Sequence, residues 1–203
     1  MKLIFATHNS GKIVEMRQIL AGFPMEIMSA DEAGVTEDVE EDGKTFEANA
    51  LKKARFVAEK SGQWAVADDS GLCVEALKGE PGVHSARYAG VEANAEQLVG
   101  KVLAKTEGLL FEKRRAAFVS TVALVAPDGR HWIFSGTING FLATEPHGPA
   151  RPKLPYDVIF IPAGHKKTFA EMSQEEKNTM SHRGRAFRKL RDFIAEELNN
   201  LDS

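Results

Sequence analysis

Apolar residues near the N-terminus follow two patterns, a short continuous run typical of a buried strand and a helical repeat of three or four residues. Residues 3–7 form the run, and Ile13, Met16 and Leu20 follow at helical spacing. A second helix is predicted over residues 45–61, where apolar residues again lie on one face. The first part of the chain is therefore expected to form a strand followed by two helices.

The central part of the chain predicts another strand and another helix. The strand covers residues 64–67, is interrupted by the polar segment 68–71 and resumes over residues 72–76. A helix is predicted over residues 94–105 with Asn94 as its N-cap, because an asparagine side chain accepts a hydrogen bond from the first turn. Strands and helices thus alternate through the first half of the chain.

The second half of the chain is richer in strand patterns. Two β-rich segments, residues 116–125 and 132–142, are joined by Pro-Asp-Gly at 127–129, which favours a hairpin. A further strand is predicted over residues 156–161, and the C-terminal segment is helical. Alternating strands and helices followed by antiparallel hairpins predict an α/β fold with a mixed sheet and a cleft between two lobes.

Length and composition narrow the class of protein. The chain has 203 residues, of which 43% are hydrophobic and 27% charged, as is ordinary for one globular domain over residues 1–203. A formal charge of −3 argues against a general nucleic-acid binder, which needs a broad basic surface. No apolar run approaches the ~20 residues of a membrane span, and the single Cys73 fits a reducing compartment. We therefore expect a cytoplasmic protein with no nucleic-acid or membrane partner.

A polar turn between the first strand and the first helix, residues 7–12, is a candidate anion site. Free backbone N–H groups and the positive end of the helix dipole meet at such a turn. Thr7 and Asn9 point the same way in an extended chain, and Lys12 adds a positive charge. The alternative is an ordinary turn with Lys12 at the surface, because the spacing of a Walker loop is absent.

A second candidate site, Asp68 and Asp69 followed by Ser70, comes directly after the predicted strand. Adjacent strand residues face opposite sides, so we expect only one of the two carboxylates to point into a cleft. Such a carboxylate can bind Mg²⁺ or accept a proton from water, although the same residues also suit a simple turn. The acidic run 37–42 is either a solvated loop or a second source of carboxylates for a metal ion.

Basic residues gather at the start of the predicted last helix. Ser181 is a suitable N-cap, which places His182 and Arg183 in the first turn, shortly after Lys177. Cations at this end oppose the helix dipole and lower the stability of the helix, which favours a ligand-binding role. The alternative is a solvated basic face.

Taken together, these segments resemble the family of inosine/xanthosine triphosphate pyrophosphatases, the Ham1-like proteins. Seven stretches match in the family's order and span nearly the whole chain. The matching stretches are residues 6–12, 45–50, 67–72, 81–88, 156–157 with 159–160, 168–172, and 176–178 with 181–184.

The resemblance implies Mg²⁺-dependent hydrolysis of the purine nucleoside triphosphates ITP, dITP and XTP between the α- and β-phosphates, which gives the monophosphate and pyrophosphate. It also implies an elongated mixed sheet flanked by helices, with the site between two lobes, usually in a homodimer. By motif, the phosphate site would comprise Thr7, Asn9, Lys12, Lys53 and Ser70. The Mg²⁺ ligands would be Glu40 and Asp69, with Asp69 also activating the attacking water. The purine site would comprise Tyr156, Asp157, Lys177, His182 and Arg183.

One segment departs from the family pattern and leaves the base preference open. Where the family typically has Gly-Phe-Gly, this chain has Lys153, Leu154 and Pro155, after a longer loop. Leu154 cannot reproduce the stacking of the family's Phe on the purine, a contact worth about 1–3 kcal/mol. The alternatives are a pyrophosphatase with another base preference, as in the related Maf-like enzymes, and a nucleotide-binding sensor without turnover.

Overall fold

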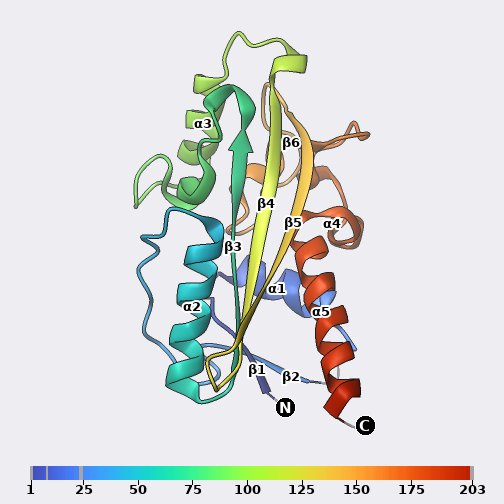
Figure 1. Cartoon of the computed structure of the whole chain (residues 1–203). Helices are drawn as coiled ribbons and strands as arrows, with labels where there is room; N and C mark the ends of the chain where they lie inside the picture. Colours follow the sequence, from blue (N-terminus) through green and yellow to red (C-terminus); the bar gives the residue numbers. More distant parts are fainter. Residues whose placement is uncertain (1, 8, 23–24, 202–203) are drawn as a thin grey trace. The chain divides into compact units, whose positions relative to one another are not determined.

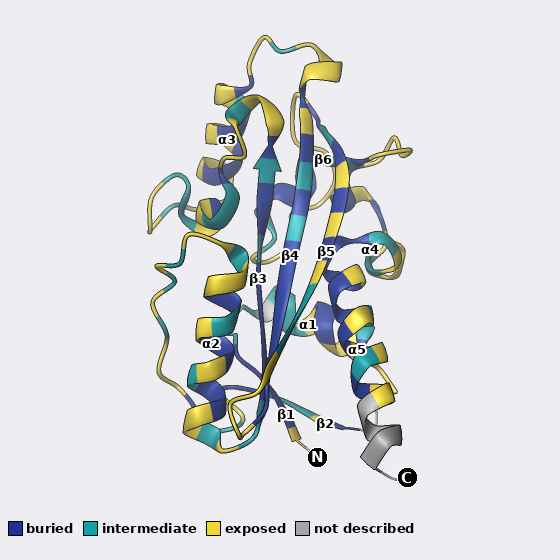
Figure 2. Cartoon of the chain, in the orientation of Figure 1, coloured by how far each residue is buried: buried dark blue, intermediate teal, exposed yellow. Residues whose placement is uncertain are grey.

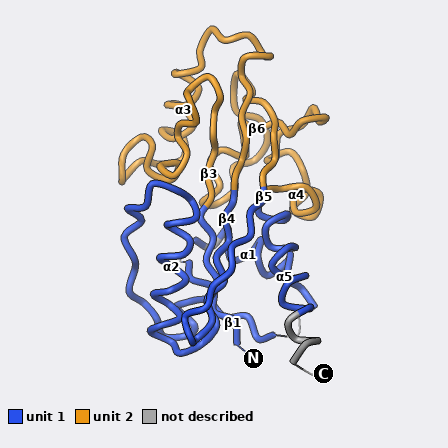
Figure 3. Tube along the Cα trace, in the orientation of Figure 1, with its two compact units in different colours: residues 1–69, 120–136, 183–203 blue, residues 70–119, 137–182 orange. Residues whose placement is uncertain are grey.

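The computed structural model describes residues 2–7, 9–22 and 25–201 of the chain. The chain divides into two compact units, coloured separately in Figure 3. Unit 1 comprises Met1–Asp69, Ser120–Gly136 and Arg183–Ser203, and unit 2 comprises Ser70–Val119 and Thr137–His182. The single domain over residues 1–203 stays a prediction. His8, which belongs to the first matching stretch, lies outside the described residues.

The strands of the described residues form a mixed sheet (Figure 1). They are β1 Lys2–Phe5, β2 Glu26–Ser29, β3 Trp64–Val74, β4 Arg115–Val125, β5 His131–Leu142 and β6 Phe160–Pro162. Their order in the sheet is β2-β1-β3-β4-β5-β6. β1 pairs in parallel with β2 and β3, whereas β5 and β6 are antiparallel. The predicted α/β fold with a mixed sheet is therefore confirmed.

The α-helices of the described residues flank the strands. They are α1 Ser10–Ile19, α2 Phe46–Ser61, α3 Ala95–Lys105, α4 Gln174–Met180 and α5 His182–Leu201. In the described part of the chain, no helix is both long enough and apolar enough to cross a membrane.

Alternate residues of the strands in unit 1 pack against different helices. Leu3 and Val66 belong to a buried cluster with residues of α1 and α5, whereas Ile4, Ala65 and Ala67 belong to a cluster with residues of α2. Figure 2 shows that β3 is largely buried. This alternation follows from the two-residue period of a strand. It also means that the next two residues of β3 after Ala67 face different helices.

Two helix starts occur where the sequence predicts them, because their signals are local. Thr45 caps α2 by accepting a hydrogen bond from the N–H of Ala48 at 3.1 Å. Asn94 caps α3 through a reciprocal pair of side-chain contacts with Gln97. Local side-chain chemistry thus sets these boundaries without help from distant residues.

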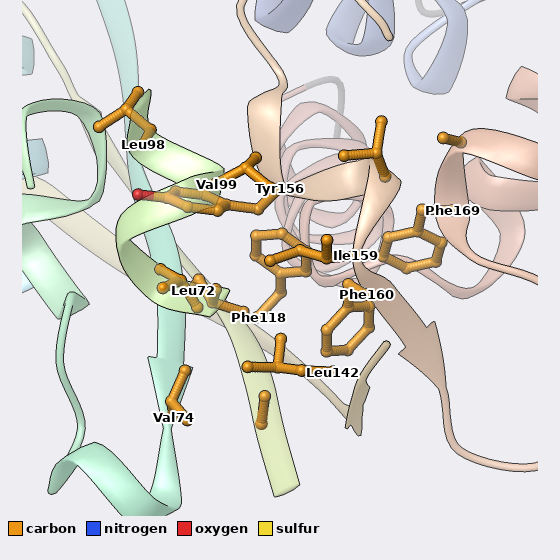
Figure 4. Packing of buried hydrophobic residues seen from close by; sticks show 14 of the residues in the cluster. Leu72, Val74, Leu98, Val99, Phe118, Leu142, Tyr156, Ile159, Phe160 and Phe169 are labelled. Atoms are coloured by element: carbon orange, nitrogen blue, oxygen red, sulfur yellow. The ribbon is translucent and has the colours of Figure 1, made fainter. Parts of the chain in front are cut away.

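The core of unit 2 is rich in aromatic rings (Figure 4). The ring of Phe160 lies 4.7 Å from that of Phe118 and 5.2 Å from that of Phe169. Tyr156 belongs to the same cluster, and its hydroxyl group donates to the carbonyl oxygen of Ser85 at 2.9 Å. These contacts hold Tyr156 in place directly after the loop that departs from the family pattern.

Two predicted strand boundaries are wrong. β3 continues through residues 68–71 without the predicted interruption, because the polar side chains there find partners inside the protein. The predicted strand over 156–161 begins only at Phe160, and Pro155–Val158 instead forms a 3₁₀ helix. Proline favours the first turn of a helix, where its missing N–H is not needed.

Candidate functional site

The two adjacent carboxylates of β3 meet different helices, as their positions in a strand require. Asp68 is 0% exposed and contacts α1 and α5, and Asp69 is 5% exposed and contacts α2. The expectation that the two side chains face opposite sides is therefore confirmed. The simple-turn alternative fails, because both residues lie within a continuous buried strand.

Asp68 is the centre of a buried ionic network in unit 1. Its Oδ1 lies 3.2 Å from Lys12 Nζ, and its Oδ2 accepts a hydrogen bond from Arg183 Nε at 3.1 Å. Burial by itself would raise the pKa of Asp68, but the charges of Lys12, Arg183 and Lys53 hold that pKa well below its usual range. Asp68 is therefore ionised at neutral pH.

The backbone carbonyl oxygen of Asp68 brings two lysines together. It accepts hydrogen bonds from Lys53 Nζ at 2.9 Å and from Lys12 Nζ at 3.3 Å. Burial lowers the pKa of Lys12 more than Asp68 raises it, and the charge of Lys53 lowers it further. The two predicted phosphate-binding lysines thus lie close enough to repel each other, and an anion at this point would relieve that repulsion.

The turn before α1 brings Lys12 into the interior. Thr7 Oγ1 accepts a hydrogen bond from the N–H of Asn9, and Asn9 Oδ1 accepts one from the N–H of Lys12, both at 3.2 Å. Asn9 is thus the N-cap of α1. The side chain of Lys12 is only 12% exposed, so the surface-lysine alternative does not hold.

Arg183, at the start of α5, is shared by two buried carboxylates. Its Nε donates to Asp68, and its Nη1 donates to Glu15, which is 1% exposed. Burial by itself would lower the pKa of Arg183, but the charges of Glu15 and Asp68 raise it. Arg183 therefore does not belong to a solvated basic face. The carboxylates of Glu15 and Asp68 balance its positive charge in the first turn of α5.

Asp69 is held by Asn49 of α2, whose Nδ2 donates to Asp69 Oδ2 at 2.9 Å. The Oδ1 of the same amide accepts from the N–H of Gly43 at 2.8 Å, which ties the acidic segment to α2. Burial raises the pKa of Asp69, with Lys53 and Lys12 opposing this effect and Glu41 adding to it. A raised pKa brings a carboxylate closer to the range suited to a proton acceptor at neutral pH.

The acidic segment contacts the site through Glu41. Glu41 Oε1 lies 2.5 Å from Lys53 Nζ, and its charge acts on Asp69. Burial alone would lower the pKa of Lys53, but Glu41 and Asp69 raise it. Glu40 is exposed, and its role as a metal ligand stays a prediction. Among the described residues, no three acidic, histidine or cysteine side chains gather as a ready metal site.

The predicted purine residues other than Arg183 lie in unit 2. Lys177 is 0% exposed, and its Nζ lies 2.6 Å from Asp157 Oδ2. His182 stacks on Phe118, with ring centroids 4.7 Å apart and planes 10° apart. Leu154 is half-buried directly before the 3₁₀ helix that contains Tyr156 and Asp157.

The predicted site residues therefore form two groups. Unit 1 holds Thr7, Asn9, Lys12, Glu40, Lys53, Asp69 and Arg183, and unit 2 holds Ser70, Leu154, Tyr156, Asp157, Lys177 and His182. Asp68 contacts Lys12, Lys53 and Arg183 of the first group. Thr7 and Asn9 join Lys12 through the turn before α1, whereas Glu40 is exposed. Sequence reasoning missed Glu15 and Asn49 as parts of the network. Glu15 could have been found because it lies one helical turn after Lys12, on the same face of the predicted helix. Asn49 could have been found because it lies within the matching stretch 45–50.

Comparison with known proteins identifies the family of this chain. The model of the Ham1 family matches residues 3–193. A dITP/XTP pyrophosphatase of Porphyromonas gingivalis is 47% identical over 95% of this chain and 97% of its own length. One of Geobacter sulfurreducens is 45% identical over 95% of this chain and 96% of its own length. The structure of a HAM1 protein from Coxiella burnetii superposes with a TM-score of 0.87 at 37% identity, covering 97% of this chain and 99% of that protein. The chain therefore belongs to the Ham1 family.

Proposed function

We propose that this protein is a Mg²⁺-dependent nucleoside triphosphate pyrophosphatase that hydrolyses ITP, dITP and XTP to the monophosphate and pyrophosphate. Its role would be to clear these nucleotides from the precursor pool. One observation supports the chemistry above all others. The side chains of two largely buried lysines, Lys12 and Lys53, both donate to the carbonyl oxygen of Asp68, next to Asp69. The names of the relatives support the choice of substrate.

We propose that Lys12 and Lys53 bind the phosphate chain. Both ammonium groups are largely buried, and burial lowers the pKa of Lys12. A polyphosphate would supply the negative charge that two neighbouring cations need. Thr7 and Asn9 shape the turn at the N-terminus of α1, where backbone N–H groups favour an anion.

We propose that Asp69 accepts the proton of the attacking water. Asn49 fixes one carboxylate oxygen, so the group is oriented before substrate arrives. Its raised pKa makes it a stronger base than an exposed aspartate. Ser70, the next residue of β3, would line the phosphate site.

We propose that Asp69 and Glu40 bind the Mg²⁺ ion. The charge of Glu41 raises the pKa of Asp69, which supports the proposal that a cation would be favoured beside these carboxylates. Mg²⁺ usually binds through one or two carboxylates together with water and substrate phosphates, so this donor set fits it. When bound, the ion would neutralise part of the phosphate charge.

For the purine, we propose contacts from Tyr156, Asp157, Lys177 and His182. A buried donor such as Lys177 pairs with the oxygen of a 6-oxo purine but not with a 6-amino group. Each such mismatch costs about 1–3 kcal/mol. Arg183 stays a predicted purine contact, and its two carboxylate partners favour a second role in fixing Asp68.

Three further properties belong to this proposal. The family resemblance favours a homodimer. The single half-buried Cys73 favours a reducing compartment, for which we propose the cytoplasm. The formal charge of −3 favours a small nucleotide over nucleic acid as the partner.

Product identification tests the reaction. The purified protein with ITP and Mg²⁺ should release pyrophosphate, and orthophosphate as the first product would contradict the proposal. Omitting Mg²⁺ should abolish turnover. Binding of ITP with no hydrolysis at any Mg²⁺ concentration would instead support the sensor alternative.

A second candidate is the same reaction on another base, favoured by Leu154 in place of the family's stacking Phe. A panel of kcat/KM values for ITP, XTP, GTP and dUTP separates the two. A preference for GTP or dUTP would overturn the proposed substrate class while leaving the reaction intact.

A further inference from the structure

Arg151 belongs to the loop in which this chain departs from the family pattern, and its guanidinium group is anchored inside unit 2. Nη2 donates to the carbonyl oxygen of Met172, and the side chain is only 17% exposed. Nη1 lies 3.6 Å from Asp157 Oδ2. The loop therefore delivers a cation to the side chains proposed to contact the purine.

Arg151 and Lys177 both contact the carboxylate of Asp157. Asp157 Oδ2 already accepts a hydrogen bond from Lys177 Nζ at 2.6 Å, so Arg151 adds a second cation to one carboxylate. The Lys177 side chain is 0% exposed and that of Asp157 is 3% exposed, so water screens these charges poorly. A negatively charged or electron-rich group would stabilise this arrangement.

The cluster also contains an unused donor. Within the part of the chain that the structure describes, Arg151 Nη1 is buried and has no hydrogen-bond partner. Its distance of 3.6 Å from Asp157 is too long for a hydrogen bond. A buried donor without an acceptor lowers stability, so a ligand oxygen at this point would supply the missing hydrogen-bond acceptor.

The surroundings favour a planar base over a phosphate group. Lys177 Nζ lies 5.4 Å from the centre of the Phe169 ring, so an aromatic side chain lies beside the charged groups. A purine can present a carbonyl oxygen to Arg151 while its ring meets apolar side chains. Xanthine has one more carbonyl group than hypoxanthine and loses a ring proton more readily, so it carries more negative charge.

We infer that Arg151 is a specificity-determining residue that donates a hydrogen bond to a carbonyl oxygen of the base and favours xanthine over hypoxanthine nucleotides. This inference rests on the proposed function, since it assigns a base to the same purine site. It also offers a physical reason for the tolerance of Leu154, because a charged hydrogen bond supplies affinity where the stacking ring is absent.

The test compares the binding of XMP and IMP, measured by calorimetry, in the full-length protein and in Arg151→Gln. We expect the affinity for XMP to fall about tenfold, the effect of losing one charged hydrogen bond, and that for IMP to fall much less. Arg151→Lys keeps the positive charge and should restore part of the preference for XMP. Arg130→Gln, which changes an exposed arginine of the hairpin in unit 1, should leave both affinities unchanged.

An equal loss for XMP and IMP, or no loss for either, would overturn the inference. The ratio of the two affinities also excludes a merely structural role, because general damage to the loop would weaken both ligands alike. Hydrolysis assays of XTP and ITP with the same proteins keep the two proposals apart. If the wild-type protein prefers XMP through Arg151 but cleaves neither triphosphate, the proposed reaction fails and the assignment of Arg151 stands.

Discussion

Arg183 donates its Nε–H to Asp68 Oδ2 at 3.1 Å, although the two residues are 115 positions apart in the sequence. This contact joins the start of α5 to β3 within unit 1. The same guanidinium group binds Glu15 of α1, so three elements of the unit meet at one buried cation. The network and the neighbouring Asp69 lead to four predictions.

Replacing Glu15 with Gln should destabilise the protein. Arg183 would lose a charged partner in a buried position, which costs about 1–3 kcal/mol of unfolding free energy. Urea unfolding of the two proteins measures the difference. Glu37→Gln is the matched control, because Glu37 pairs with Lys60 at the exposed surface and its loss should have no measurable effect. Equal stabilities of the wild type and Glu15→Gln would contradict the role of Glu15.

Replacing Asp68 with Asn should lower stability in a pH-dependent way. The pKa of Asp68 is lowered in the folded state, so its ionisation stabilises the fold above the unfolded pKa of about 4 and this contribution disappears as the pH falls towards the folded pKa. Breaking a buried ion pair costs about 3–5 kcal/mol at neutral pH. The difference in unfolding free energy should be constant between about pH 5 and 8 and shrink below about pH 4. A difference that does not change with pH would argue against an ionised Asp68.

Replacing Asp69 with Asn should abolish most of the turnover and leave nucleotide binding largely intact. Loss of a general base typically lowers the rate by about 10²–10⁴. The measurements are kcat for ITP and the Kd of IMP by calorimetry. Asp128→Asn, in the exposed hairpin between β4 and β5, should behave as the wild type. A wild-type kcat in Asp69→Asn would remove Asp69 from the proposed mechanism.

Replacing Asn49 with Ala should move the acidic limb of the pH–rate profile to higher pH. The hydrogen bond from Asn49 lowers the pKa of Asp69, so its loss raises that pKa, and the ionised base then forms only at higher pH. The profile of kcat/KM for ITP measures the shift. Asn94→Ala removes the N-cap of α3 in unit 2 and should lower stability without moving the limb. A limb that moves equally in both variants would point to a general loss of structure.

Local chemistry explains why several elements could be predicted from the sequence. Thr45 and Asn94 cap their helices through bonds to residues three positions away, so the sequence contains both partners. The opposite orientation of Asp68 and Asp69 follows from the period of a strand. The predicted break in β3 was wrong, because turn-forming residues remain in a strand when distant side chains satisfy their polar groups.

The family motifs supplied most of the candidate site residues, but they did not reveal which side chains form hydrogen bonds and ion pairs with one another. Glu15 and Asn49 were missed because their importance lies in contacts with Arg183 and Asp69, which are 168 and 20 positions away. The orphan donor of Arg151 likewise depends on the path of a loop that no pattern specifies.

By itself, the amino-acid sequence determined the family, the mixed α/β class, the local helix starts and the set of polar residues from which a phosphate site can be built. Only the tertiary structure decided that Asp68 contacts Lys12, Lys53 and Arg183, and that Asn49 donates a hydrogen bond to Asp69. The reason is physical. Helix and strand signals act over a few residues, whereas buried charges are stabilised by partners that folding brings from far along the chain.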